Sequence, residues 1–441
     1  MDYMKKIEKW LERWLVPIGQ KLNGNKYLSI LKHSMASLIP ITIAGSIALI
    51  ITNFPFIDNV LPATFLEEMR AVLAPINGIT INLISIYLII AIAYHYAKEF
   101  EMEFHYTISI AMASFLILIP FEKATESGEL LSKVIPVEYL GSSGMFVAIF
   151  CTFFSCWLFR KISSTKLTIK MPESVPPNVI DAFSALVPFF VVLIVMIAIR
   201  FVFSLTPFND VNTFVYSVIQ LPLTNIGTGF IPTVLIGILV QLFWFMGLHG
   251  QSLVGSVMHP IWIAARNANN AAFLAGKELP YIVTEEFVAE FMWPSFIGLV
   301  ITLVIFSKKG TANRAVGNAA IGAAAFKISE PVVFGLPIVM NVLTLIPWVL
   351  VMAVNATVSY GAMYIGLVPR PTGVTIPWTT PPIISGYLVT NSIGGSLLQI
   401  VNIAIGVLIW VPFIKALSSQ SAAELENSEI VESDSNIETI N

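Results

Sequence analysis

Charged residues are scarce in this sequence. They make up 12% of the 441 positions, whereas hydrophobic residues make up 56%. A soluble globular domain is about 25% charged, so the chain lacks the polar surface that would cover a water-soluble fold. No Asp, Glu, Lys or Arg stands between Asp210 and Arg266, and between Glu330 and Lys415 the only one is Arg370. Stretches of this length are long enough for several bilayer crossings of about 20 residues each.

Other absences exclude whole classes of function. The sequence has no Walker loop, no metal-ligand spacing, no GxSxG motif and no acid cluster for a cation pathway, so we expect neither nucleotide hydrolysis nor a metal or other cofactor. The net charge of −3 gives no reason to expect a nucleic-acid partner. The two cysteines, Cys151 and Cys156, lie in an apolar run and are predicted to be small buried hydrophobes, with a disulfide as the alternative.

Residues 1–27 are predicted to be an amphipathic segment lying in the membrane interface. The first 16 residues are charged rather than apolar, so we expect no cleavable signal peptide. Apolar residues recur at helical spacing, with lysine, glutamate and arginine on the other side. A short soluble cap is the alternative. The apolar face consists of Met4, Ile7, Trp10, Leu11 and Trp14.

Apolar segments predict an all-α membrane protein of about ten crossings. The loops 160–170 and 308–314 are rich in lysine and arginine and are expected inside, whereas the acid-leaning loop 53–70 is expected outside. Both termini are therefore expected in the cytoplasm. Residues 416–441, rich in Ser, Glu and Asn, are predicted to be a disordered cytoplasmic tail. The main segments are about 34–52, 79–97, 106–121, 143–159, 182–204, 231–248, 291–307, 337–355 and 396–414.

Two stretches break the helical pattern at predicted membrane depth. Glycines interrupt the uncharged stretch 245–260, and the stretch 371–395 is dense in Pro, Gly and Thr. Irregular backbone at that depth is tolerated only where protein buries it or where it lines a wet cavity. We therefore expect two re-entrant hairpins around a central binding site. An ordinary external loop is the alternative for 371–395.

Glu330 is the most informative single residue. It stands in KISEPVVFGLP, and no formal charge follows it before Arg370. A carboxylate at bilayer depth costs a few kcal/mol, so it normally faces a cavity or a partner. Pro331 predicts a helix break here, which would let the acid reach a ligand. A structural acid paired with Lys327 and a helix end at the interface are the alternatives.

His249 and two tryptophans border the predicted breaks. The His249 imidazole, in WFMGLHGQS, can donate and accept, which suits a sugar hydroxyl. A histidine satisfied by a neighbouring group is the alternative. Aromatic faces such as those of Trp244 and Trp378, with a few polar groups beside them, suit a small-ligand site, whereas interface anchors are the alternative. His259, which precedes Pro260, is predicted to be an interface or hinge residue.

Five stretches in order along the chain carry a family resemblance. They are PIGQKLNGNKYLSILKHSMASLIPITIAGS near the start, YLGSSGMFVAI, MPESVPPNVIDAFSALVP, FWFMGLHGQS and KISEPVVFGLP. Over about residues 10–415 the sequence resembles the membrane-spanning enzyme IIC component (EIIC) of the bacterial phosphoenolpyruvate-dependent sugar phosphotransferase system, in its lactose, cellobiose and diacetylchitobiose branch. The resemblance implies the EIIC fold, a homodimer of ten-span protomers with two re-entrant hairpins.

The resemblance also implies two domains and six site residues. Residues 28–205 would form an N-terminal membrane domain with the dimer interface, and residues 206–415 a C-terminal domain that binds the sugar. In this family a glutamate and a histidine contact the hydroxyl that receives phosphate, two tryptophans stack on the sugar rings, and backbone at a serine–glycine turn lines the pocket. The matching residues are Glu330 and His249, Trp244 and Trp378, and Ser143 and Gly144.

The implied function is that of a sugar-specific permease in the bacterial cytoplasmic membrane. It would bind a disaccharide such as diacetylchitobiose or cellobiose, carry it inward and present a hydroxyl to a phosphocysteine on a soluble IIB partner. That partner depends in turn on IIA, HPr and enzyme I, and no fused IIA or IIB domain is expected here. The alternatives are a proton- or sodium-coupled transporter in which Glu330 and His249 titrate, and a membrane sensor that binds sugar without moving it.

Overall fold

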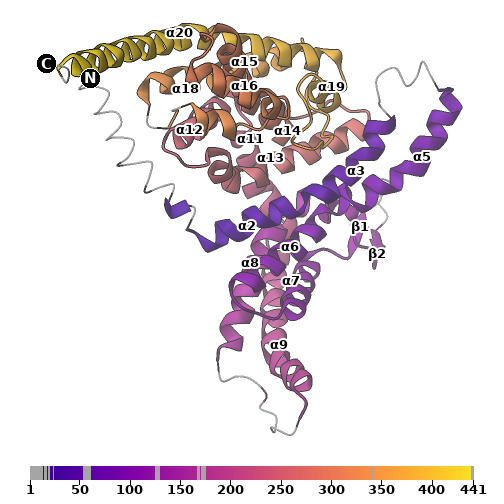
Figure 1. Ribbon diagram of the computed structural model, residues 1–441. Helices are drawn as coiled ribbons and strands as arrows, with labels where there is room; N and C mark the ends of the chain where they lie inside the picture. The colour runs from indigo at the N-terminus through magenta and orange to yellow at the C-terminus, as the bar shows by residue number, and fades with distance from the viewer. Residues whose placement is uncertain are drawn as a thin grey trace.

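Helices dominate the part of the chain that the structure describes (Figure 1). The predicted interfacial segment lies mostly outside this part, including the whole of its apolar face. Glu122–Ala124 (β1) and Leu130–Ser132 (β2) form a short antiparallel ribbon, which the all-α prediction missed. The computed structural model describes residues 13, 17, 20–22, 24–52, 61–124, 130–165, 169, 175–336, 338, 339 and 341–438.

The N-terminal half contains the helices that the first apolar segments predict. The helices α6, α7, α8 and α9 pack side by side into one bundle, which lies below the rest of the molecule in Figure 1. The elements of this half are α2 (Lys26–Ser37), α3 (Ile39–Thr52), α5 (Ala63–Ile79), η1 (Ile81–Leu83), α6 (Ile84–Glu99), α7 (Phe104–Leu118), η2 (Val137–Tyr139), η3 (Ser142–Gly144), α8 (Met145–Ser163) and α9 (Pro177–Ser204).

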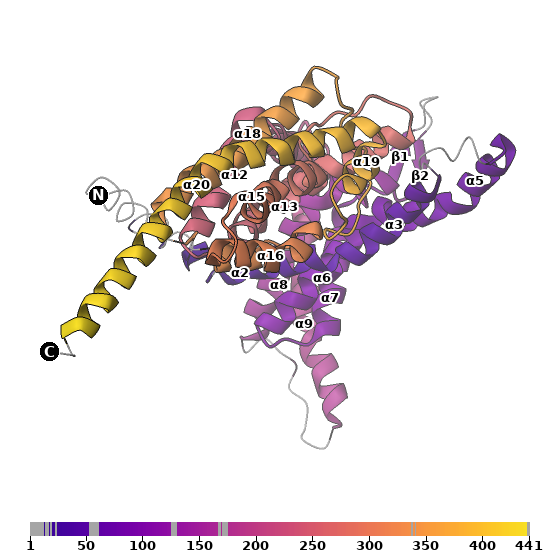
Figure 2. The same cartoon turned by 45° about the horizontal axis from the view of Figure 1, so that its top comes forward.

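The C-terminal half is more irregular, with short helices between the long ones. Figure 2 shows the long helix α20 running across this half, and α20 packs against α15 and α18. The elements are α10 (Val211–Phe214), the π-helix η4 (Val215–Gln220), α11 (Leu221–Gly227), α12 (Phe230–Phe245), α13 (Gly250–Leu274), α14 (Glu285–Phe287), the π-helix η5 (Val288–Met292), the 3₁₀-helix η6 (Trp293–Phe296), α15 (Ile297–Phe306), α16 (Ala312–Ala325), α17 (Glu330–Gly335), α18 (Val342–Tyr364), α19 (Ile384–Thr390) and α20 (Ile393–Glu438).

Buried apolar side chains form two separate cores. One core joins side chains from Ile30 to Val215, together with Ile263 and Ala264 of α13. The other runs from Val240 to Ile414. Helix α13 contacts α2 and η3 on one side and α12 and α14 on the other, so it connects the two cores. The predicted domain limits at 205 and 415 stay predictions.

Seven helices among the described residues are long and apolar enough to cross a membrane. An eighth is reached if Val211–Gly227 and Phe230–Phe245, which meet at 68°, count as one broken span. The predicted segment 106–121 corresponds to the short apolar helix α7. The described residues therefore include helices with the length and apolar character that membrane spans need, whereas the ten crossings and the two re-entrant hairpins stay predictions.

The two predicted breaks differ in extent. In the stretch 245–260 the break covers only the turn between α12 and α13, where Gly247 has a φ of +74°. The helix α13 then passes Pro260 without ending. By contrast, residues between α18 and α19 are irregular, and Asn391, with a φ of +51°, separates α19 from α20.

Helix α20 extends beyond the predicted span. Its backbone is helical as far as Glu438, where the sequence predicts a disordered tail from residue 416. The stretch SAAELENSEIVE contains alanine, leucine and glutamate, which have high helix propensity. The residues of this tail therefore favour a helix locally, even though the tail is too polar to pack against a core.

Candidate functional site

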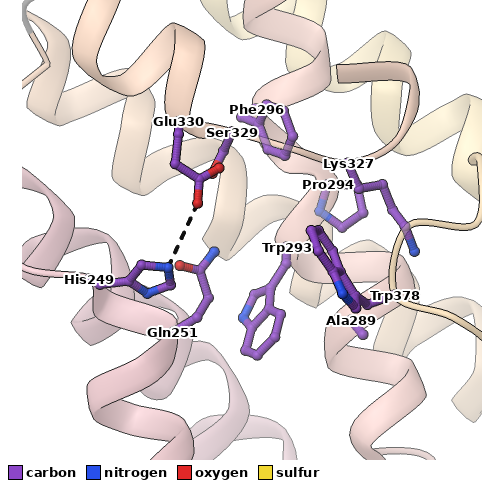
Figure 3. Close-up of a pocket in the computed structure, with 10 residues that line it drawn as sticks. All are labelled: His249, Gln251, Ala289, Trp293, Pro294, Phe296, Lys327, Ser329, Glu330 and Trp378. Carbon is purple, nitrogen blue, oxygen red and sulfur yellow. Dashed lines mark ion pairs between the residues drawn. The ribbon is translucent and has the colours of Figure 1, made fainter. Parts of the chain in front are cut away.

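A cavity of about 320 Å³ lies in the C-terminal half (Figure 3). Four segments contribute to its walls: the α12–α13 junction, η5 with η6, the turn between α16 and α17, and the irregular stretch before α19. This volume is within the range of small-ligand pockets, about 300–1,000 Å³. The lining residues are His249, Gln251, Ala289, Trp293, Pro294, Phe296, Lys327, Ser329, Glu330 and Trp378.

Glu330 is the first residue of α17 and projects into this cavity. Helix α16 ends at Ala325, so the predicted helix break is present and precedes the acid by a few residues. The side chain of Glu330 is 49% exposed, and its Oε1 lies 3.9 Å from His249 Nε2. The alternative that pairs Glu330 with Lys327 is not what the structure shows, because the Lys327 ammonium contacts both carboxylate oxygens of Glu290 at 2.5 and 2.7 Å.

His249 is the N-cap residue of α13. Its Nδ1 accepts a hydrogen bond of 3.2 Å from the backbone N–H of Ser252. In the neutral ring the proton is then on Nε2, which faces Glu330. The distance of 3.9 Å between these two atoms is longer than a hydrogen bond. An oxygen atom about 2.8 Å from each of them fits between the two groups. A ligand hydroxyl there would donate to Glu330 and accept from His249.

Trp244 does not line the cavity. It is 2% exposed, and its indole N–H donates to Gln251 Oε1. Its ring lies against the His249 imidazole, with centroids 4.6 Å apart. The end of α12 turns this indole beneath the start of α13, and Gly250 permits the close approach because a Cβ there would lie 2.1 Å from the Val240 carbonyl oxygen. Trp244 therefore supports His249 and Gln251 from behind, and its predicted stacking on sugar stays a prediction.

Trp378 is 58% exposed and contributes an indole face to the cavity. The 3₁₀-helix η6 supplies a second indole, from Trp293, which sequence reasoning did not single out. The sequence WPSF could have drawn notice, because a proline follows a tryptophan within an apolar span. Both rings offer apolar faces of the kind that pack against the C–H faces of a pyranose.

Ser143 and Gly144 lie elsewhere. They form the 3₁₀-helix η3 before α8, and neither lines the cavity. The Ser143 hydroxyl donates to the carbonyl oxygen of Glu138, while a Cβ on Gly144 would lie 1.8 Å from the carbonyl oxygen of Tyr139. The local contacts account for these two residues by packing alone, so their contact with a ligand stays a prediction.

A second set of charges lies along α13 and α14. Arg266, 3% exposed in its side chain, contacts Glu285 at 2.6 Å and Glu286 at 3.6 Å. His259 Nδ1 lies 3.1 Å from the other oxygen of Glu285, and its predicted role as an interface or hinge residue stays a prediction. Thr375 lies 3.5 Å from Glu286. Among the described residues no group of His, Cys, Asp or Glu has the arrangement of a metal site.

The two cysteines agree with the sequence. Cys151 and Cys156 are buried in α8 and are not bonded to each other. They therefore act as small apolar side chains in the N-terminal core.

The pH dependence of ligand binding follows from His249. Burial lowers the pKa of this imidazole below its ordinary value of 6.5, although the neighbouring Glu330 opposes the shift. The ring is therefore neutral at pH 7. Protonation at lower pH would pair the imidazolium directly with Glu330 and close the gap that a hydroxyl needs. We expect sugar affinity to be constant between about pH 7 and 8 and to fall as the pH drops below 6.5. Calorimetric titration checks this, and the His249→Asn variant should lack the step.

Comparison with known proteins shows the family to which the chain belongs. The family "Phosphotransferase system, EIIC" matches residues 32–351. The oligo-beta-mannoside-specific EIIC component of Bacillus subtilis is 38% identical over 96% of both chains, and the cellobiose-specific EIIC component of Geobacillus stearothermophilus is 34% identical over 96% of both. The crystal structure of the transporter ChbC, the IIC component from the N,N'-diacetylchitobiose-specific phosphotransferase system, is 33% identical and superposes with a TM-score of 0.89, covering 95% of this chain and 99% of ChbC. The chain therefore belongs to the EIIC family of the sugar phosphotransferase system.

Proposed function

We propose that this chain binds a β-linked disaccharide in the cavity of Figure 3, carries it across the bacterial cytoplasmic membrane and presents one hydroxyl to phosphorylated IIB. The observation that supports this most strongly is the Glu330–His249 pair, 3.9 Å apart in a cavity that also holds two indoles. Relatives named for oligo-β-mannosides, lichenan and cellobiose favour β-linked glucosides or mannosides, with diacetylchitobiose as a further candidate.

The arrangement suits phosphoryl transfer from a phosphocysteine. The hydroxyl oxygen would attack phosphorus, the bond from phosphorus to cysteine sulfur would break, and the hydroxyl proton would pass to Glu330. His249 would hold the same oxygen through Nε2–H, while Trp293 and Trp378 would fix the plane of the sugar ring. Such a reaction depends mainly on positioning and charge stabilisation. The anionic product would then face the carboxylate of Glu330, which favours its release.

The proposal includes the finer features of the fold. In this proposal the chain has ten spans, two re-entrant hairpins and cytoplasmic termini, which the sequence resemblance and the loop charges favour. The 68° bend between α11 and α12 and the irregular stretch before α19 support broken elements at membrane depth. Side chains of α9 support a homodimer through the N-terminal half, because the exposed ones are largely apolar, although lipid also suits such a surface. They include Phe190, Ile194, Ile197 and Phe201.

A vesicle assay tests the function. Membrane vesicles that contain this chain, loaded with phosphoenolpyruvate, enzyme I, HPr, IIA and IIB, should accumulate phosphorylated cellobiose, mannobiose or chitobiose without an ion gradient. Vesicles without phosphoenolpyruvate should accumulate no sugar phosphate. Accumulation of free sugar that requires a proton or sodium gradient would contradict the proposal. Binding of sugar with neither uptake nor phosphorylation would contradict it as well.

A further inference from the structure

The span that borders the cavity has an irregular backbone. Between Glu285 and Phe306 the helix passes through the π-helix η5 and the 3₁₀-helix η6. Such segments release backbone carbonyls and are frequent at functional sites. The carbonyl oxygens of Glu290 and Phe291 accept hydrogen bonds from Gln399 and Asn402 of α20, at 2.9 and 3.1 Å. The irregular stretch is therefore held in place by α20 at membrane depth.

The side chain of Glu290 makes a second attachment, to Lys327. The two side chains are 2% and 5% exposed, and both carboxylate oxygens lie within 2.7 Å of the Lys327 ammonium. The neighbours of Glu290 along the chain, Ala289 and Trp293, line the cavity. The pair thus connects the η5–η6 wall of the cavity to the turn between α16 and α17.

Lys327 also shapes the turn that leads to Glu330. It has a φ of +61°, a left-handed backbone conformation that is unfavourable for a residue other than glycine. The backbone N–H groups of Lys327 and Ile328 donate to the carbonyl oxygens of Ala324 and Ala323, both at 3.0 Å, which closes the end of α16. The chain then enters Ser329 and Glu330, which both line the cavity. A shift of Lys327 would therefore move the acid.

We propose that the Glu290–Lys327 ion pair positions Glu330, holding its turn at a fixed place relative to the Trp293 wall. The inference rests on the proposed function of this cavity. Lys327 itself does not contact Glu330 in this arrangement, since its ammonium points away from the Glu330 carboxylate (Figure 3). A well-packed apolar pair would stabilise the fold as well as a buried ion pair does. What the ion pair adds is a short, directed connection between two cavity walls.

The test replaces both charges together. The variant Lys327→Met with Glu290→Gln leaves no unpaired buried charge, so it should fold with a thermal midpoint close to that of the wild-type chain. We expect its sugar affinity to fall about 10-fold, because Glu330 loses its place beside the hydroxyl. The rate of sugar phosphorylation at saturating sugar should fall about 100-fold, the effect of a misplacement of about 1 Å. Wild-type affinity and rate in a folded variant would overturn the proposal.

A mutant cycle that combines these substitutions with Glu330→Gln tests whether the ion pair acts by positioning Glu330 or by stabilising the structure in general. If the pair acts through Glu330, adding Lys327→Met and Glu290→Gln to Glu330→Gln should lower neither affinity nor rate by more than about 2-fold. Additive losses would show that the pair acts elsewhere and would overturn the inference. The matched control removes the exposed Lys26–Glu99 pair, 2.9 Å apart, as Lys26→Met with Glu99→Gln, and should retain both values.

The wild-type chain separates this inference from the proposed function. If it binds sugar but forms no sugar phosphate with the soluble phosphotransfer proteins, the proposed function fails. In that case only sugar affinity is measured in the cycle. The affinity losses caused by Glu330→Gln and by Lys327→Met with Glu290→Gln should still be non-additive. Additive affinity losses in that case would overturn the positioning role as well.

Discussion

Replacing Glu330 by glutamine is expected to lower the rate of sugar-phosphate formation by about 10²- to 10⁴-fold, the usual contribution of a general base. Glutamine keeps the size of the side chain and one carbonyl acceptor but takes no proton from the hydroxyl. The sugar should still bind, because the two indoles and His249 remain. The measurement is the initial rate of sugar-phosphate formation in vesicles at saturating sugar and saturating phosphorylated IIB.

The matched control is Glu278→Gln. Glu278 is 89% exposed, pairs with Arg370 at 3.6 Å and does not line the cavity. The same chemical change there should leave the rate unaltered. If the Glu330→Gln variant formed sugar phosphate within about 3-fold of the wild-type rate, Glu330 would not be the general base.

Replacing Arg266 by methionine is expected to destabilise the protein by about 3–5 kcal/mol, since it leaves the buried Glu286 and the partly buried Glu285 without the guanidinium that pairs with them. Arg266 contacts both Glu285 and Glu286, and these acids lie at the start of the span that carries η5 and η6. Arg266 also lies on α13, the helix whose N-cap is His249. Thermal unfolding of the detergent-solubilised protein, followed by size-exclusion chromatography, measures the loss.

The control for this prediction is Lys26→Met. Lys26 and Glu99 are 59% and 35% exposed, so their pair is worth about 0–1 kcal/mol. Equal thermal midpoints for the two variants would show that the Arg266 cluster does not stabilise the fold. Restoration of the midpoint by adding Glu285→Gln and Glu286→Gln to Arg266→Met would assign the loss to the unpaired acids.

Part of the candidate site is predictable from the sequence because charges are rare in it. Glu330 stands out as an acid in an apolar stretch, and Pro331 predicts the helix break that the structure has just before it. His249 stands out between two glycines, and Trp378 in a stretch rich in proline and threonine. The structure brings these three side chains to one cavity, although they are up to 129 positions apart.

The rest of the site depends on tertiary packing that the local pattern does not encode. Trp293 reaches the cavity because the span containing it changes from π- to 3₁₀-helix, and hydropathy carries no sign of that change. Trp244 is a comparable case, since its position behind His249 depends on how tightly α12 and α13 approach. The proximity of Lys327 to Glu330 in sequence suggested a pair, but Glu290, 37 positions away, is the partner.

The fold, like the site, is only partly predictable from the sequence. The long apolar segments predict the main helices, because each apolar run must satisfy its own backbone hydrogen bonds in lipid. The β1–β2 ribbon and the helical backbone of α20 beyond residue 416 were not predicted, since short polar segments carry no comparable constraint.

The central claim is that one sugar hydroxyl lies between Glu330 and His249. A structure of the wild-type chain with bound disaccharide, at a resolution that places the hydroxyl oxygens, tests it most directly. The account predicts one hydroxyl oxygen within about 3.2 Å of both Glu330 Oε1 and His249 Nε2, with a sugar ring against Trp293 or Trp378. A disaccharide bound elsewhere, or in this cavity with no hydroxyl near either group, would contradict it.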